Sequence, residues 1–325
     1  MKLRRIYCIL LPLLMLTMAA GLCFGSAPLS LSELAAAFSG PGTARTILLG
    51  IRLPRVLAGM LAGVGLSTAG VLLQTVTANE LASPNIIGIN SGAGLAVILL
   101  LTLAPKAGAW IPMSAFCGAF GAALVILGVG SRLGSSRSGI LLIGIAVTTL
   151  FNAVISFLSL LDEGILAQYN HFTVGSLRAV RLGELLVPGI IIALGFCGAL
   201  ALSGRLSLLS LGDGAASALG VRVKPLRLAS MACAAACSAA VVSFAGLLGF
   251  VGLVVPHIAR AMTGERPARL LVTAALTGGI LVILADLLGR TLFAPSELPV
   301  GILMSLIGAP YFLWLLIRRK KYAGN

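Results

Sequence analysis

Charged residues are scarce in this chain. Only 10% of its 325 residues are Asp, Glu, Lys or Arg, whereas 59% are hydrophobic, and the mean hydropathy is +1.10. A soluble domain carries about 25% charged residues, so this composition excludes a soluble protein and predicts an outer surface that faces lipid. The apolar runs are long and continuous, which excludes the alternating pattern of a membrane β-barrel and predicts spanning α-helices.

The chain also lacks the motifs of an energy-converting enzyme. None of its five Lys residues lies in a Gly-x-x-x-x-Gly-Lys-Ser/Thr phosphate-binding loop. The sequence shows no cluster of acidic, basic, nucleophilic or metal-binding residues of the kind that forms an active site. We therefore expect no catalytic residue, no bound metal and no cofactor in this chain. If ATP drives its activity, ATP and Mg²⁺ must bind another subunit.

Neither the basic charge nor the cysteines indicate a binding site. The net charge of +14 is spread over loops between apolar runs, so it does not predict a nucleic-acid partner. Cys233 and Cys237 share a helix face without a His or acidic neighbour, so packing is expected for them instead of metal binding.

Ten apolar segments predict an all-α polytopic membrane protein with one transmembrane domain over residues 1–325. A cleaved signal peptide is an alternative for the first segment, but the many later spans favour an uncleaved helix. The expected spans are Ile6–Phe24, Val56–Thr75, Ile86–Leu103, Ala109–Gly130, Ile140–Leu161, Leu185–Ser203, Leu228–Ala245, Leu247–Ala261, Leu271–Leu292 and Val300–Ile317.

The distribution of basic residues predicts the orientation. Ten spans place both termini on one side of the membrane, and most of the 23 Lys and Arg residues fall in loops on that side. Because cytoplasmic loops are enriched in Lys and Arg, we expect both termini in the cytoplasm. The loop at about 204–227 then lies in the cytoplasm as well.

This cytoplasmic loop contains a short helical pattern. Asp213 is expected to cap a two-turn helix that ends at Leu219, and Gly220 is expected to adopt the left-handed conformation that terminates it. A helix of this length is marginal in water, so it must pack against something. The residues leave open whether it is a connector or a docking element for a cytoplasmic partner.

Polar residues inside the spans have more than one interpretation. Asp286 precedes Arg290 by four residues, so the two can pair on one helix face; a structural role is favoured over a proton relay. Thr149, Asn152 and Ser156 recur at helical spacing and predict either a polar stripe along a path or hydrogen bonds between helices.

Three blocks of sequence carry a family resemblance. They are RLPRVLAGMLAGVGLSTAGVLLQTVTANELASPNIIGINSGAG (Arg52–Gly94), LGDGAASALGV (Leu211–Val221), and GFVGLVVPHIARAMTGERPARLL (Gly249–Leu271) continued by ADLLGRTLFAPSELPVGILMSLIGAPYFLWLL (Ala285–Leu316). In this order they resemble the FecCD-type permeases, the membrane subunits of ABC importers for ferric siderophores, haem and cobalamin.

The resemblance implies the type II, BtuC-like importer fold with about ten transmembrane helices. It also implies a homodimer with the translocation path on its two-fold axis, two ATPase subunits on the cytoplasmic side and an extracytoplasmic substrate-binding protein. The expected location is the bacterial cytoplasmic (inner) membrane. An importer of the same fold for another ligand, such as an oxyanion, remains an alternative, and so does an ion-coupled secondary transporter.

The resemblance further implies roles for particular residues. The family usually reads Arg-Asn-Pro-Leu-Ala where this chain has Ala78-Asn79-Glu80-Leu81-Ala82, which places the gate role of this loop in question. The implied ATPase-coupling residues are Asp213, Ala215, Ala216, Leu219, Gly220 and Val221. The implied binding-protein docking residues are Arg52, Arg55 and Arg290. The gate and pathway candidates are Asn79, Leu81, Ser135, Ser136, Thr149, Asn152 and Ser156.

Overall fold

The computed structural model describes residues 2–27, 30, 32–33, 37, 40, 42–132 and 137–323. All regular elements within these residues are helices, which confirms the predicted all-α fold. The main elements are α1 (Lys2–Cys23), α3 (Thr43–Arg45), the π-helical η1 (Thr46–Arg52), α4 (Leu53–Thr77), α5 (Ile89–Leu103), η2 (Gly108–Trp110), α6 (Ile111–Arg132), α7 (Arg137–Ser159), α8 (Glu163–Val174), η3 (Leu182–Leu185), α9 (Leu186–Leu209), α10 (Asp213–Ala218), α11 (Val223–Ala245), α12 (Val251–Thr263), α13 (Pro267–Thr291) and α14 (Val300–Ala323).

The apolar helices correspond to the predicted spans. Among the described residues, seven helices are long and apolar enough to cross a membrane, and three shorter apolar helices accompany them at Ile89–Leu103, Val251–Thr263 and Val300–Leu315. Several helices are longer than their predicted segments; α9, for example, continues beyond Ser203 through Arg205 to Leu209. Hydropathy marks where apolar residues end, whereas a helix can continue past the membrane surface.

The helix α8 was not predicted. Its first turn is capped by Asp162, whose Oδ1 accepts hydrogen bonds from the backbone N–H groups of Gly164 (2.7 Å) and Ile165 (3.4 Å). The helix ends at Gly175, where φ is +70°. Asp162 followed by Glu163 is a helix-start signal, but the segment is too polar to stand out as a span.

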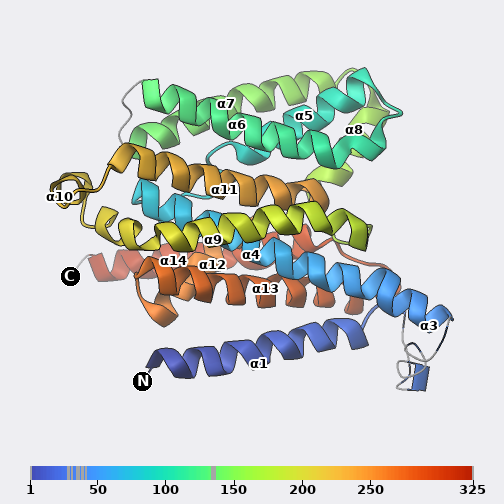
Figure 1. Cartoon of the computed structure of the whole chain (residues 1–325). Coiled ribbons are helices and arrows are strands. Elements are labelled where there is room, and N and C mark those ends of the chain that lie inside the picture. Colours follow the sequence, from blue (N-terminus) through green and yellow to red (C-terminus); the bar gives the residue numbers. More distant parts are fainter. Residues whose placement is uncertain are drawn as a thin grey trace.

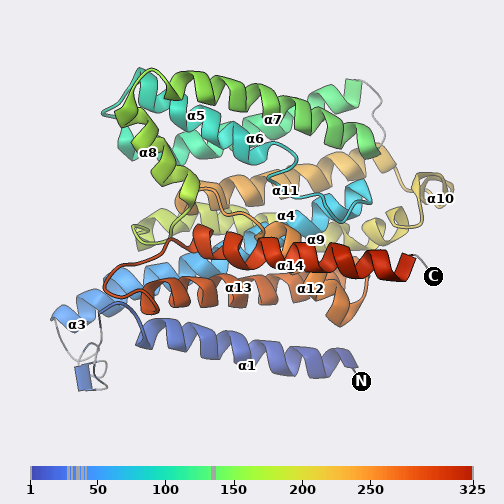
Figure 2. The same ribbon diagram turned by 180° about the vertical axis from the view of Figure 1, so that it is seen from behind.

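Helix α4 is the centre of the bundle. It packs against α13, α11, α12 and α9, and most of its residues are buried (Figures 1 and 2). Helix α1 lies at the periphery, against α13. At the opposite edge of the bundle, α5, α6, α7 and α8 form a group that lies across α11 from α4 and α13. Both marked termini and α10 lie at one end of the molecule, and α3 lies at the other (Figure 1).

Small residues allow the central helices to approach closely. A Cβ atom on Gly63 would overlap the backbone of Gly278, so α4 and α13 meet backbone to backbone. Gly70 meets Gly252 of α12 in the same manner. Small residues at helix crossings are typical of membrane proteins, where close van der Waals contact replaces the hydrophobic effect as a driving force.

Candidate functional site

The helix α10 projects beyond the ends of α9 and α11 (Figure 1). Gly212 occupies the N-cap position and Asp213 is the first helical residue, so the predicted cap position is wrong by one residue. The helix end is as predicted: Gly220 has φ +81° and its N–H donates to Ser217 O (3.0 Å). The N–H of Val221 donates to Ala216 O (3.0 Å), which completes a Schellman motif.

The two faces of α10 differ. Ala216 and Val221 are buried in the main core cluster of the bundle. Ala215 is exposed, and so are Leu219 (58% exposed) and the nearby Leu211 (64%). One face therefore anchors α10 to the bundle, and the other presents apolar side chains away from it.

A buried ionic network lies near the opposite end of the bundle. Arg55 Nε donates to Asp286 Oδ1 (2.8 Å), and Arg55 Nη1 donates to Glu297 Oε2 (2.8 Å). Asp286 Oδ2 is also 3.6 Å from Arg290 Nε, which confirms the predicted pair. Arg55, Asp286 and Arg290 are each at most 4% exposed. Buried charges of this kind require partners.

Arg290 of this network, together with Arg52, also contacts the last turn of α1. Arg52 Nη1 donates to the carbonyl oxygens of Leu22 (2.8 Å) and Cys23 (2.6 Å), and Arg290 Nη2 donates to Gly21 O (2.6 Å). The last carbonyls of a helix lack partners within it, and basic side chains near this end satisfy them. Arg52, Arg55 and Arg290 are therefore engaged inside the chain, and their docking role stays a prediction.

Glu297 is a member of this network that the sequence did not single out. It lies in the loop between α13 and α14, where Ser26 and Arg55 donate hydrogen bonds to its carboxylate and Arg178 Nε lies 3.7 Å away. Burial raises the pKa of the Glu297 carboxyl, but these hydrogen bonds and the positive charges outweigh it and hold the pKa below its ordinary value. The side chain of Arg178 is 74% exposed and is the outermost cation of the group.

The loop after α4 is held by its own side chains. Ala78 has φ +48° and ends α4, and Asn79 Oδ1 accepts a hydrogen bond from the N–H of Leu81 (2.9 Å). This Asx turn orders the loop although Glu80 stands where the resemblance implied a proline. Glu80 Oε2 lies 3.5 Å from His257 Nδ1 of α12, and Leu81 is 42% exposed. Ser135 and Ser136, the other gate candidates, lie outside the described residues.

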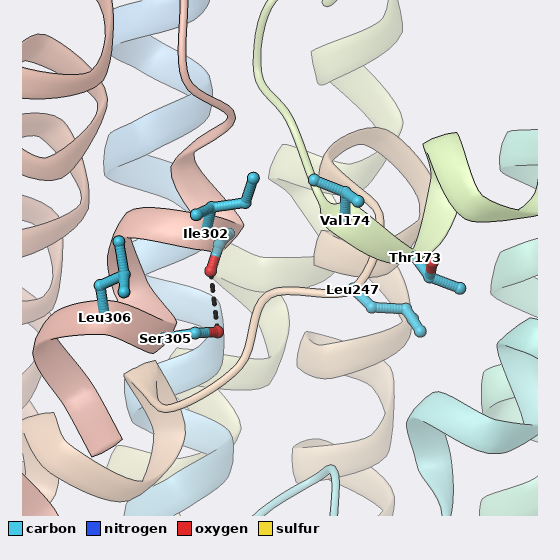
Figure 3. A pocket seen from close by; sticks show the side chains of 7 residues that line it. Thr173, Val174, Leu247, Ile302, Ser305 and Leu306 are labelled. Atoms are coloured by element: carbon cyan, nitrogen blue, oxygen red, sulfur yellow. Dashed lines mark hydrogen bonds between the residues drawn. The ribbon is translucent and has the colours of Figure 1, made fainter. Parts of the chain in front are cut away.

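A pocket of about 360 Å³ lies where three segments converge (Figure 3). The end of α8 and the start of α14 meet closely there: the N–H of Gly301 donates to Gly175 O (3.1 Å), and a Cβ on Gly301 would overlap the Val174 carbonyl. Ser305 Oγ donates to Gly301 O (2.9 Å). The residues that line this pocket are all uncharged: Thr173, Val174, Leu247, Gly301, Ile302, Ser305 and Leu306.

The chain matches the FecCD transport family over residues 13–318. This protein belongs to the FecCD transport family. It is 37% identical to the iron(3+)-hydroxamate import system permease protein FhuG of Bacillus subtilis, over 86% of this chain and 87% of that protein. It is 39% identical to the hemin transport system permease protein HmuU of Yersinia pestis, over 85% and 84% of the two chains.

A solved structure extends the likeness to three dimensions. An inward-facing conformation of a metal-chelate type ABC transporter superposes with a TM-score of 0.87 at 30% identity, and the match covers 97% of this chain and 99% of that one. This FecCD-family chain is therefore a multi-pass membrane protein with the fold that the sequence motifs implied.

The pathway candidates of this FecCD-family member lie on α7. The side chains of Thr149, Asn152 and Ser156 are exposed, and Thr149 Oγ1 donates to Ile145 O (2.9 Å) of its own helix. They form a polar stripe on the surface of the chain and do not line the pocket of Figure 3. In the part of the chain that the structure describes, no three His, Cys, Asp or Glu side chains are placed to hold a metal ion.

Proposed function

We propose that this chain is the transmembrane permease subunit of an ABC importer. In this proposal it translocates a metal chelate that a binding protein delivers, while a separate subunit hydrolyses ATP. The observation that carries the proposal is the likeness, over almost the full length of both chains, to the metal-chelate type ABC transporter structure.

The proposed cargo is a ferric siderophore, haem or cobalamin. Relatives at 36–39% identity are named as permeases for iron(3+)-hydroxamate, Fe(3+)-citrate, hemin and cobalamin. The pocket beside Thr173 and Ser305 offers hydroxyl and apolar groups without a charged side chain. Such a surface suits the passage of a bulky chelate that the binding protein has already selected.

The proposed assembly is a homodimer with two ATPase subunits and one extracytoplasmic binding protein, in the bacterial cytoplasmic (inner) membrane. The exposed polar stripe of Thr149, Asn152 and Ser156 supports a path between two protomers, because a polar stripe facing lipid would lose its hydrogen bonds to water. Cytoplasmic termini would place α10 on the side of the ATPase. ATP and Mg²⁺ would then bind only the partner.

The coupling proposal assigns α10 to a cleft on the ATPase subunit. Leu211 and Leu219 would enter the cleft, while Ala216 and Val221 keep the helix on the bundle. Three exposed cations flank α10: Arg205 near the end of α9, Arg222 just before α11 and Lys224 in the first turn of α11. The rim of the cleft should therefore be acidic.

Docking and gating are proposed for the remaining candidates. Arg52, Arg55 and Arg290 would stabilise the surface on which acidic residues of the binding protein dock, with the exposed Arg178 at its edge. The loops with Asn79 and Leu81, and with Ser135 and Ser136, would close the cytoplasmic end of the path.

Ion-coupled secondary transport is less well supported. It would need an ionisable group inside the membrane that can exchange a proton or cation. Asp286 is the best candidate, but Arg55 and Arg290 both contact its carboxylate. Both carboxylate oxygens thus face arginine side chains inside the chain, and Asp286 is only 3% exposed, which fits a structural ion pair better than a group that exchanges protons with a path.

Reconstitution in liposomes tests the proposal. The chain would be assembled with its ATPase subunit and binding protein, and uptake of ferric hydroxamate, ferric citrate, haem and cobalamin would be measured with and without ATP. We expect ATP-dependent uptake of at least one chelate, and none when the ATPase carries a substitution in its phosphate-binding loop. Uptake by the permease alone, without ATP, would reject the proposal in favour of secondary transport.

A further inference from the structure

The short helix α10 is joined to the bundle through a glycine at each end. Gly212 (φ +105°) precedes it and Gly220 (φ +81°) follows it, and no atom lies within 4 Å of a Cβ built on either. Both residues thus have a positive φ that glycine adopts without strain. A six-residue helix between two such points would rotate about them if nothing else restrained it.

The first connection is the shorter and stiffer one. The N–H groups of Leu211 and Gly212 donate to the carbonyls of Leu208 and Leu209 (both 3.1 Å), so a tight turn joins α10 directly to the end of α9. The second connection is extended: Arg222 has φ −74° and ψ 91° before α11 begins at Val223. Backbone hydrogen bonds therefore join α10 to the end of α9, whereas the Schellman bonds at the other end stay within residues 216–221 and do not reach α11.

An ion pair restrains the second side, in addition to the burial of Ala216 and Val221 in the core. Arg227, in the second turn of α11, donates from Nη2 to Oδ2 of Asp213 at the start of α10 (2.9 Å). The Arg227 side chain is 12% exposed and the Asp213 side chain is 46% exposed. Arg227 is thus held in a fixed, mostly buried position, where a charge-assisted hydrogen bond is stronger than on an open surface.

We propose that the Asp213–Arg227 ion pair locks the glycine-flanked α10 to α11, so that a push on α10 moves α9 and α11 together. The proposal rests on the proposed coupling role of α10 and adds a positioning role for Arg227, which the family resemblance did not single out. Helix α11 packs against α4, α6 and α9, so this contact would pass the displacement to the centre of the bundle. Without it, the push would reach α11 only indirectly, through the packing of α9 and through Ala216 and Val221 in the core.

Arg227→Gln and Asp213→Asn test this proposal in the complete importer. The readout is substrate taken up per ATP hydrolysed, which a merely structural role would not change once the amount of assembled complex is normalised. We expect this ratio to fall about tenfold in either variant, as for loss of one charge-assisted hydrogen bond, while ATP hydrolysis continues. The exchanged pair Asp213→Lys with Arg227→Glu should restore much of the ratio.

Arg269→Gln is the matched control, because Arg269 is an exposed arginine in the first turn of α13 and has no part in the proposed ATPase contact. Hydrogen–deuterium exchange provides a second readout: the backbone amides of residues 211–221 should exchange faster in Arg227→Gln than in Arg269→Gln. If Arg227→Gln does not assemble, the half-exposed Asp213→Asn still tests the pair.

The failure of this proposal differs from failure of the proposed function. An unchanged uptake-to-ATP ratio and unchanged exchange in Arg227→Gln and Asp213→Asn, with ATP-driven uptake in the wild type, would overturn the ion-pair role alone. ATP-independent uptake by the wild type would instead overturn the proposed function.

Discussion

Arg55 donates through Nε to both carboxylate oxygens of Asp286, at 2.8 and 2.9 Å. The two residues lie on α4 and α13, the most extensively packed pair of helices in the bundle. Each is at most 4% exposed. The ion pair therefore joins α4 to α13, the helix against which α1 packs. In the proposed topology it lies near the extracytoplasmic end of both helices.

Removing the acid of this pair should destabilise the chain strongly. Asp286→Ala leaves Arg55 and Arg290 buried close to each other without the carboxylate between them. We expect a loss of about 3–5 kcal/mol, the usual cost of breaking a buried pair, measured as a lower thermal unfolding temperature in detergent. Arg178→Gln is the control: its side chain is 74% exposed, so its loss should cost at most about 1 kcal/mol. Equal effects of the two substitutions would contradict the structural role of Asp286.

Glu297 should give stability a dependence on acid pH. Its pKa is lower in the folded chain than in the unfolded chain, so its contribution is fully present above the unfolded-state pKa and is lost as the pH falls through the folded-state value. Unfolding temperatures between pH 7 and pH 3 should therefore decrease more steeply in the wild type than in Glu297→Gln, because the amide does not titrate. Parallel pH profiles of the two proteins would show that the contacts of the Glu297 carboxylate with Arg55 and Ser26 do not stabilise the folded chain.

Local sequence was enough to predict the apolar helices and α10. The ten apolar segments and the short helix before Gly220 depend on neighbours within a few residues, and so does the pairing of Asp286 with Arg290 one helical turn away. Hydropathy and capping report such relationships directly. Helix α8 was missed because its apolar content is too low for a span, although Asp162 and Glu163 mark its start.

Long-range contacts could not be predicted in the same way. Arg55 and Glu297 are 242 positions apart, and no pattern in a single sequence pairs them. The burial of Arg52 depends on where the last turn of α1 lies, which only the folded chain determines. The resemblance to the FecCD family identified these arginines as notable, but it did not show that they hold α1 in place.

Close packing of α4 against α13 should be sensitive to one methyl group. Gly63→Ala would place a Cβ against the backbone of Gly278, which can only be relieved by moving the helices apart. Overpacking of this kind costs about 1–3 kcal/mol, visible as a lower unfolding temperature. Gly121→Ala in α6 is the matched control, since nothing lies within 4 Å of its Cβ; it should be neutral or slightly stabilising. A neutral Gly63→Ala would show that the two helices are farther apart.

The Asx turn of the gate loop can be tested with a conservative pair of substitutions. Asn79→Ala removes the acceptor for the Leu81 N–H, whereas Asn79→Asp retains an oxygen at the same position. The lost hydrogen bond is worth about 1 kcal/mol, too little to unfold the chain but enough to loosen a short loop. In liposomes preloaded with substrate and lacking ATP, Asn79→Ala should leak faster than the wild type, and Asn79→Asp should not. Equal leakage from both variants would mean that the proposed gate does not depend on this turn. The contact between Glu80 and His257 would then be the next one to test by substitution.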